Sequence, residues 1–132
     1  MDISVSEHQG RVPVTVLHLK GDVNAATAGQ LEAQAKEAYA AGARNMLIDL
    51  SGVGFMSSAG LRVLHEVFNM LRGNMPGESD EAIRKGLADG TFKSPHLKLL
   101  SPKKHVREVL SMAGFDMFLE IHRDLKEAVA SF

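Results

Sequence analysis

The residues with the clearest chemical potential lie in one short stretch, IDLSGVGFMSSAGL at positions 48–61. Its apolar start and its glycines predict a strand, a turn and the beginning of a helix. Such a junction can expose a serine hydroxyl beside backbone N–H groups that have no partner within the helix. Ser57 and Ser58 are therefore the first candidates for binding, catalysis or modification.

Two phosphate-binding motifs do not fit this stretch. A dinucleotide site needs G-x-G-x-x-G, and although Gly52 and Gly54 match, Ser57 stands at the third glycine position. A Walker loop ends in Gly-Lys-Ser or Gly-Lys-Thr, and the chain has no lysine between Lys36 and Lys85. We therefore expect no nucleotide cofactor, and nothing else in the sequence points to another cofactor.

A serine hydrolase is disfavoured by the same residues. The nucleophile elbow of such enzymes needs G-x-S-x-G, but Met56 stands two residues before Ser58, and Ala59 stands two residues after Ser57. The six histidines are scattered and show no metal-ligand spacing such as H-E-x-x-H. We expect no metal site, and a small serine hydrolase stays an alternative.

The simplest role for either serine is to cap the following helix, which contributes about 1 kcal/mol. The alternative is phosphorylation, since the dipole and free N–H groups of a helix N-terminus stabilise an attached phosphate. A phosphate would add a charge of about −1.5 to −2 to an exposed turn without unfolding the domain. Charge repulsion and desolvation would then prevent a partner from docking there.

Hydrophobic periodicity and capping residues predict the order β-β-α-β-α-β-α-β-α around this junction. Strands are expected at 2–7, 12–19, 45–50, 96–100 and 117–121. Helices are expected at 25–41 after a cap at Asn24, from residue 102 after a cap at Ser101, and after Asp124. The first two strands form a hairpin, and the later strands, separated by helices, should be parallel. The class is α/β with about four α-helices, or α+β if the helices share one face.

Residues 73–95 interrupt this alternation. They hold four of the 12 glycines and two of the four prolines, and Ile83 and Leu87 stand four apart within them. This pattern predicts an inserted loop with a short helix in a single domain of 132 residues. The insert is either a solvated excursion or a partner-specific surface.

DLSGVGFMSSAGL, from Asp49 to Leu61, resembles the signature of the STAS domain family, the bacterial anti-sigma factor antagonists. LKGDVN at 19–24 resembles the family's first turn, and LLSP at 99–102 its later strand-to-helix turn. The resemblance covers nearly the whole chain outside 73–95. It implies a STAS-like mixed sheet and a protein-binding module that is not an enzyme.

The resemblance further implies a switch controlled by phosphorylation. Aligned through Phe55 and Gly60, the phosphorylated serine of the family falls on Ser58, with Ser57 as the less favoured acceptor. Ser57 occupies a position where the family usually has aspartate, and Asn24 occupies another. The implied partners are an anti-sigma factor or similar serine kinase and a serine phosphatase. A non-switching STAS scaffold subunit of a larger signalling complex is the alternative.

The partner contacts that the resemblance implies lie on two turns and one helix, and Met56 is expected to be exposed among them. The predicted contact residues are Gly21, Asp22, Asn24, Ala25, Met56, Ser57, Ser58 and Arg62.

Composition excludes several other classes. Fifteen Lys and Arg against 16 Asp and Glu leave a net charge of −1, which disfavours binding to nucleic acid. The absence of cysteine excludes disulfides, thiolate metal sites and a cysteine nucleophile. No apolar run approaches the roughly 20 residues that span a bilayer, and no signal peptide follows Met1. We expect a cytoplasmic monomer or weak dimer that does not bind membranes.

Overall fold

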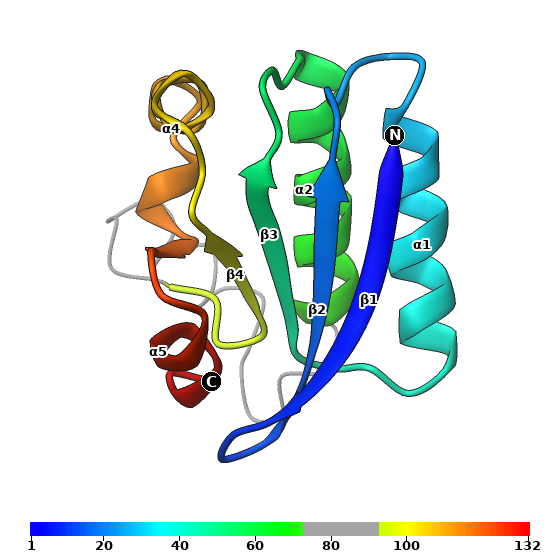
Figure 1. The fold of residues 1–132 in the computed structure, drawn as a ribbon, viewed down its shortest axis with the longest axis vertical. Helices are drawn as coiled ribbons and strands as arrows, with labels where there is room; N and C mark the ends of the chain where they lie inside the picture. Colours follow the sequence, from blue (N-terminus) through cyan, green and yellow to red (C-terminus); the bar gives the residue numbers. More distant parts are fainter. Residues whose placement is uncertain (73–92) are drawn as a thin grey trace.

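A computed structural model of the chain describes residues 1–72 and 93–132, which form one five-stranded sheet with helices against it (Figure 1). The strands lie in chain order across the sheet. They are β1 (Asp2–Gln9), β2 (Pro13–Lys20), β3 (Met46–Gly52), β4 (Leu97–Leu100) and β5 (Glu120–His122). The first pair is antiparallel and every later pair is parallel, so the predicted hairpin and parallel strands are confirmed.

The helices of the described residues are α1 (Ala28–Ala40), α2 (Ser58–Arg72), α4 (Lys104–Met112), α5 (Leu125–Ala130) and a short 3-10 helix, η1 (Phe115–Met117). The cap predicted at Asp124 is confirmed, because its Oδ2 accepts a 2.9 Å hydrogen bond from the Glu127 N–H. None of these helices combines the length and apolar character needed to cross a bilayer. The short helix predicted around Ile83 and Leu87 lies outside the described residues.

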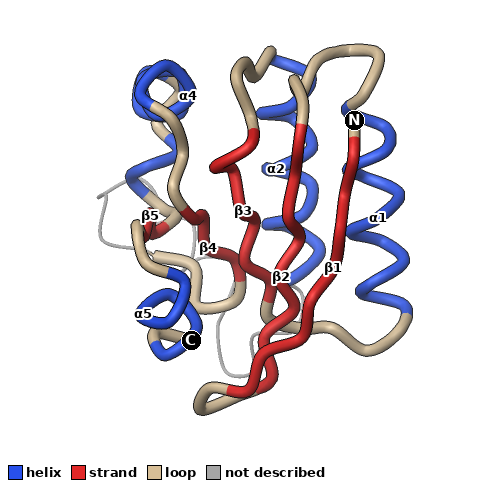
Figure 2. The backbone as a smooth tube through the Cα atoms, viewed as in Figure 1, coloured by secondary structure: helices blue, strands red, loops and turns tan. Residues whose placement is uncertain are grey.

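One face of the sheet, which we call the covered face, packs against α1, α2 and α4. Side chains alternate between the two faces of a strand, and β3 places Met46, Ile48 and Leu50 on this one. Figure 2 shows α1 and α2 together behind the strands. Leu61, Leu64, Phe68 and Leu71 recur at helical spacing along α2, a pattern that predicts a core face. Leu64, Phe68 and Leu71 are buried, whereas Leu61 is half-buried.

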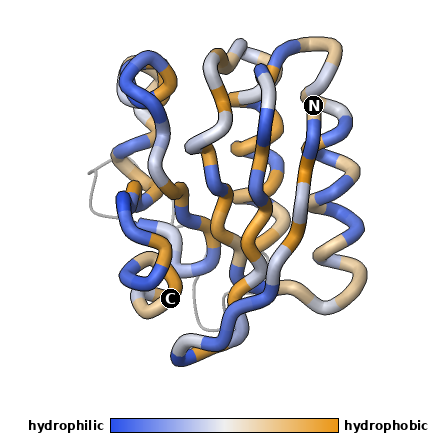
Figure 3. Tube along the Cα trace, viewed as in Figure 1, coloured by the Kyte–Doolittle hydropathy of each residue, from blue (hydrophilic) through white to orange (hydrophobic). Residues whose placement is uncertain are grey.

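The other face, which we call the open face, is covered only in part among the described residues. α5 packs there with Val129 against a smaller cluster that includes Val16 of β2 and Leu47 of β3. Figure 3 shows hydrophobic colour where the central strands cross the middle of the molecule. Because helices lie on both faces of a largely parallel sheet, the class is α/β.

The first helix begins later than predicted. α1 begins at Ala28 instead of residue 25, because Asn24 closes a separate turn ahead of it. The Oδ1 of Asn24 accepts hydrogen bonds from the N–H groups of Ala26 (2.9 Å) and Thr27 (3.2 Å). Asn24 therefore stabilises the turn that precedes α1 and does not cap the first turn of the helix.

Two further boundaries were predicted wrongly. α4 begins at Lys104 rather than residue 102, because Ser101 has a φ of 49° and its hydroxyl donates to the carbonyl of Arg123 (3.0 Å). The last strand begins at Glu120 rather than residue 117, because the chain first forms the 3-10 turn of η1.

The last residues of the predicted insert pack against the domain. Ser94 is 1% exposed, and its N–H donates a hydrogen bond to the Phe118 carbonyl (2.8 Å).

Candidate functional site

The serines lie on the edge of the sheet where the parallel strands end. Residues 53–57 connect β3 to α2, residues 21–27 connect β2 to α1, and residues 101–103 connect β4 to α4. The carboxyl ends of parallel strands meet at one edge, which brings these three turns together. All three lie at the upper end of the view in Figure 1.

Backbone hydrogen bonds join the first two of these turns. The N–H of Gly21 donates to the Gly52 carbonyl (3.0 Å), and the N–H of Val23 donates to the Phe55 carbonyl (2.9 Å). The N–H of Ser57 returns a hydrogen bond to the Val23 carbonyl (2.8 Å). The structure thus brings together the two segments that the sequence analysis selected separately.

Buried side chains fix the distance between these turns and α2. Val23 is fully buried and forms a parallel bridge with Met56, which is 1% exposed. Gly60 makes this packing possible, since a Cβ there would lie 2.7 Å from the Val23 Cγ1 and 2.9 Å from the Met56 Cγ. The expected exposure of Met56 is therefore wrong: its side chain fills the space beneath the turn instead of facing a partner.

The turn before α1 presents polar groups beside the serine turn. The hydroxyl of Thr27 donates to the Asp22 carbonyl (2.7 Å), and the Asn24 carbonyl accepts from the N–H of Ala28 (2.8 Å). Asp22 is exposed, and a Cβ at Gly54 would lie 3.3 Å from its Oδ1. The Asp22 carboxylate therefore lies close to Gly54 of the serine turn.

The remaining residues of this turn differ in exposure. Gly21 is half-buried and has a φ of +118°, which a residue with a side chain adopts only with strain. Ala25 is exposed and Asn24 is half-buried. The turn is thus held in shape by its backbone while two of its side chains, Asp22 and Ala25, face solvent.

Ser57 and Ser58 have different environments despite being neighbours. Ser57 is half-buried, and its Oγ accepts a 3.2 Å hydrogen bond from the Ala59 N–H, so it caps α2. Ser58 is the first residue of α2 and is exposed, and among the described residues its hydroxyl has no hydrogen-bond partner. Neither hydroxyl is bonded to a histidine within the part of the chain that the structure describes.

Charged side chains on the exposed surfaces of α1 and α2 form ion pairs between residues four positions apart. Arg62, four residues after Ser58, is exposed and lies 3.0 Å from the Oε1 of Glu66. Lys36 lies 3.0 Å from Glu32 on α1, and this contact holds the pKa of Glu32 below its usual value. Since residues four apart share a helix face, Arg62 flanks Ser58 on the solvent side.

Sequence reasoning missed an aromatic contact that extends this surface. The Phe55 ring is 43% exposed and stacks on the imidazole of His105 in α4, with centroids 6.1 Å apart and planes 17° from parallel. In the sequence, Phe55 is noticed only as part of the motif, and His105 is one of six histidines without a common spacing. No local pattern pairs positions 50 residues apart, so only the sheet order could have shown this contact.

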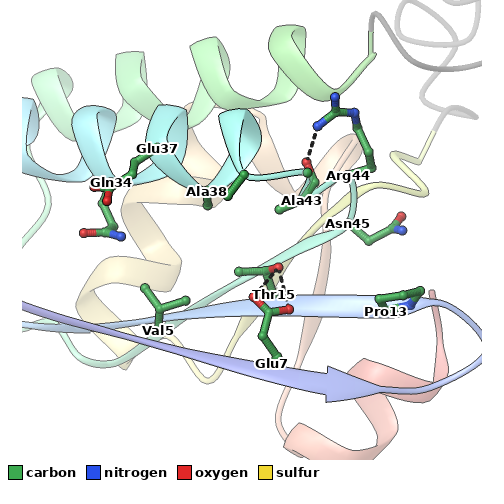
Figure 4. A pocket seen from close by; sticks show the side chains of 12 residues that line it. Val5, Glu7, Pro13, Thr15, Gln34, Glu37, Ala38, Ala43, Arg44 and Asn45 are labelled. Atoms are coloured by element: carbon green, nitrogen blue, oxygen red, sulfur yellow. Dashed lines mark hydrogen bonds between the residues drawn. The ribbon is translucent and has the colours of Figure 1, made fainter.

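The serine turn is not the wall of a described cavity. A groove of about 640 Å³ lies between β1, β2 and the end of α1, lined by Ala38 and by the Glu7 carboxylate, which accepts hydrogen bonds from the Thr15 hydroxyl (Figure 4). Neither this groove nor two smaller ones is lined by Ser57 or Ser58.

Comparison with known proteins identifies the family. The family model described as the STAS domain matches residues 4–75. BtrV of Bordetella bronchiseptica, provisionally named an anti-sigma factor antagonist, is 34% identical over 114 residues, covering 86% of this chain and 82% of BtrV. An anti-sigma factor antagonist from Mycobacterium paratuberculosis has the same fold, with a TM-score of 0.71, 21% identity, and coverage of 98% of this chain and 92% of that one.

A second solved structure is SpoIIAA, a Bacillus cell fate determinant, in its phosphorylated form. It matches with a TM-score of 0.63 at 16% identity, covering 97% of this chain and 96% of that chain. At this level of identity, the solved structures support the fold alone. The family model and the match to BtrV carry the assignment: the chain belongs to the STAS domain family.

Proposed function

We propose that this protein is an anti-sigma factor antagonist whose binding is controlled by phosphorylation. In this proposal it binds a serine-kinase anti-sigma factor while Ser58 is unphosphorylated, and it is released when the kinase phosphorylates Ser58. A serine phosphatase restores the binding form. The name of its 34% identical relative BtrV supports the antagonist class. The existence of a phosphorylated SpoIIAA supports phosphorylation as a reaction compatible with this fold.

The observation that carries the proposal is the contrast between the two serines. Ser57 already uses its hydroxyl as a helix cap, whereas Ser58 is exposed and free among the described residues. A phosphate at the first position of a helix is stabilised by the helix dipole, so it need not disturb the fold. It would add a charge of about −1.5 to −2 to the exposed turn between β3 and α2, which changes the surface that a partner meets.

The proposed contact surface surrounds Ser58. It consists of the side chains or backbone of Gly21, Asp22, Asn24, Ala25, Ser57, Ser58 and Arg62. We add Phe55 in place of Met56, because Phe55 is the exposed apolar residue at this turn. An exposed aromatic ring with charged residues around it is a common arrangement at the centre of protein interfaces.

The test is binding and phosphorylation with candidate serine kinases of the source organism. Incubation with ATP should add one phosphate by intact mass, mapped to Ser58, and Ser58→Ala should accept none. Ser58→Ala should bind the kinase in every nucleotide state, whereas Ser58→Asp should weaken binding at least about tenfold through like-charge repulsion and desolvation. Ser57→Ala is the matched control: it should still be phosphorylated, at a stability cost of about 1 kcal/mol.

The alternatives predict different results. A STAS scaffold subunit would form stable larger assemblies by light scattering, and Ser58→Ala and Ser58→Asp would bind its partners equally. A hydrolase using this turn would be labelled by a fluorophosphonate probe at Ser57 or Ser58. Equal binding of Ser58→Ala and Ser58→Asp to the kinase contradicts the switch.

A further inference from the structure

The open face of the sheet carries a hydrogen-bonded chain of four side chains, away from the serine turn. The Oγ of Ser6 on β1 lies 2.8 Å from the Nε2 of His18 on β2. The Nδ1 of His18 lies 2.7 Å from the Oδ2 of Asp49 on β3. The Nε2 of His8 on β1 lies 2.9 Å from the same Ser6 oxygen.

The sheet register explains why these residues meet. Ser6 pairs with Val16 and Ser4 pairs with His18 across β1 and β2, and His18 pairs with Asp49 across β2 and β3. Opposite residues point to the same face, so Ser6, His18 and Asp49 lie on one face of three neighbouring strands, with Asp49 opposite His18 and Ser6 diagonal to it. The sequence analysis found no such arrangement because the three residues are 12 and 31 positions apart.

The hydrogen bonds assign each group one role. The Oδ1 of Asp49 accepts from the Ser51 N–H (3.0 Å), which holds the carboxylate in place. Burial raises the pKa of Asp49, but hydrogen bonds from Ser51 and His18 outweigh burial and hold it below its usual value. The ionised carboxylate therefore accepts a hydrogen bond from the His18 Nδ1, which keeps its proton. The His18 Nε2 is then left as the acceptor for the Ser6 hydroxyl, which is the arrangement that activates a serine.

His8 completes this assignment. Since the Ser6 hydroxyl donates to His18, the bond to His8 requires its Nε2 to carry a proton and donate to the Ser6 oxygen. His8 thus donates a hydrogen bond to the Ser6 oxygen, which helps to orient the Ser6 hydroxyl toward His18. Within the described part of the chain, no group of three metal-ligating side chains comes together, so the cluster does not have the composition of a metal centre.

The cluster can be reached from solvent. β1 is an edge strand, Ser6 is half-buried and the His18 side chain is 32% exposed. α1 and α2 lie on the opposite side of the sheet from this cluster (Figure 2). A groove of about 360 Å³ lies beside the imidazole and is lined by Ser4, His18 and Asp49 among others, but not by Ser6.

We propose that Ser6 is a reactive serine that accepts an acyl group from an activated acyl donor, an ester or a thioester. The Ser6 Oγ forms a bond to the acyl carbon while its proton moves to the Nε2 of His18. The bond from the acyl carbon to the leaving oxygen or sulfur breaks, and the leaving group takes that proton from His18. Ser6 becomes an O-acyl serine, and no electrons are gained or lost.

The test uses the full chain and p-nitrophenyl acetate as the probe. We expect release of p-nitrophenol together with the mass of one added acetyl group, mapped to Ser6. Ser6→Ala should abolish this adduct. His18→Gln, which keeps a polar side chain but supplies no base, should slow acetylation about 10²-fold or more. Asp49→Asn should slow it less, because the imidazole is still present but is no longer held in the required tautomer.

Two control variants separate this inference from general serine reactivity and from the proposed function. Ser4→Ala removes a hydroxyl from the same face of the same strand and should leave the adduct unchanged. Ser58→Ala should also leave it unchanged, so failure of the switch and failure of this site are distinguishable. Circular dichroism and thermal unfolding of each variant verify that the sheet is intact.

Three outcomes overturn the inference: no adduct on Ser6, equal acetylation of Ser4 and Ser6, or an unchanged rate in a folded His18→Gln variant. Any of them would mean that the chain of hydrogen bonds only satisfies polar groups on the open face.

Discussion

The two faces of the sheet are built from the same strands but have different chemistry. β3 shows this most directly, because Ile48 belongs to the large cluster under α1, α2 and α4, while its neighbours Leu47 and Asp49 face the other way. The covered face is apolar apart from the pair of Glu7 and Thr15 beside α1, whereas the open face changes from an apolar patch under α5 to polar side chains over β1–β3. The covered face therefore fixes how the helices pack on the sheet, whereas polar side chains on the open face remain accessible to solvent.

This difference extends to the serine turn. Val23, Met56 and Gly60 connect that turn to the covered face by tight packing, so the backbone around Ser58 is positioned by the core. A modified Ser58 can then change the charge of the surface without changing the fold beneath it. On the open face, by contrast, position depends on hydrogen bonds and ion pairs, which are more sensitive to substitution and to pH.

The largest expected effect comes from truncating the two faces of β3 separately. Ile48 and Leu47 are adjacent and both fully buried, so they form a matched pair. Large-to-small core substitutions cost about 2–5 kcal/mol, depending on how far the surroundings collapse. We expect Ile48→Ala near the upper end and Leu47→Ala near the lower end, because the six-residue α5 can shift toward Leu47.

Urea unfolding at neutral pH measures both values. Val5→Ala, at an edge position that is 42% exposed, is the control and should stay within about 0.5 kcal/mol of the original protein. A larger loss for Leu47→Ala than for Ile48→Ala would mean that α5 is held as firmly as the helices on the covered face.

A second, smaller effect is expected at Lys98, which attaches the C-terminal segment to the open face. Its side chain is 3% exposed, and its ammonium group lies 2.8 Å from the Ser131 carbonyl, 3.0 Å from Glu120 and 4.9 Å from the centre of the Phe132 ring. Lys98→Ala should cost about 1–3 kcal/mol, since it removes a buried side chain together with its hydrogen bonds to Ser131 and Glu120. Because Glu120 is 38% exposed, water compensates part of that loss.

Lys98→Met is the companion variant, because it keeps the length of the side chain but removes its charge. We expect it to lose less stability than Lys98→Ala, since its chain still fills the space against α5. Amide hydrogen exchange in α5 should rise in both variants and more in Lys98→Ala. Equal losses of stability in the two variants would contradict this account, because packing of the aliphatic part of the side chain would then contribute nothing to stability.

Much of the covered face could be predicted from the sequence. The nearly continuous apolar runs of β2 and β3 and the helical spacing of Leu64, Phe68 and Leu71 are local patterns with a direct physical cause. The wrong start of α1 comes from a local turn closed by Asn24, whereas the wrong start of α4 comes from a non-local contact. Ser101 is a good capping residue, but its hydroxyl instead donates to Arg123, 22 positions away, and α4 begins later.

The candidate site was predicted unevenly for the same reason. The motif located Ser57 and Ser58, but it could not show that Met56 turns inward against Val23, because that depends on how two distant turns pack. The stacking of Phe55 on His105 and the row from Ser6 to Asp49 both join separate strands or helices. Such contacts follow from strand order and register, which no single segment of the sequence specifies.

The smallest expected effect is a pH dependence confined to the open face. The pKa of Asp49 is held below its usual value, because hydrogen bonds from Ser51 and His18 outweigh the effect of burial. A carboxyl whose folded pKa is depressed stabilises the protein above its unfolded pKa, about 3.9 for aspartate, and loses that contribution as the pH falls through the folded pKa.

Asp49→Asn removes this contribution, so the variant should be less stable than the original protein at pH 7. The difference should shrink as the pH falls below about 4, where the carboxyl of the original protein takes up a proton. Urea midpoints measured across this range test the prediction, with Asp2→Asn as an exposed control of the same charge change. If the stability difference between the two proteins does not change as the pH falls below about 4, Asp49 stabilises the fold through its shape and its neutral hydrogen bonds and not through its charge. The polar row of the open face would then depend on packing in the same way as the covered face.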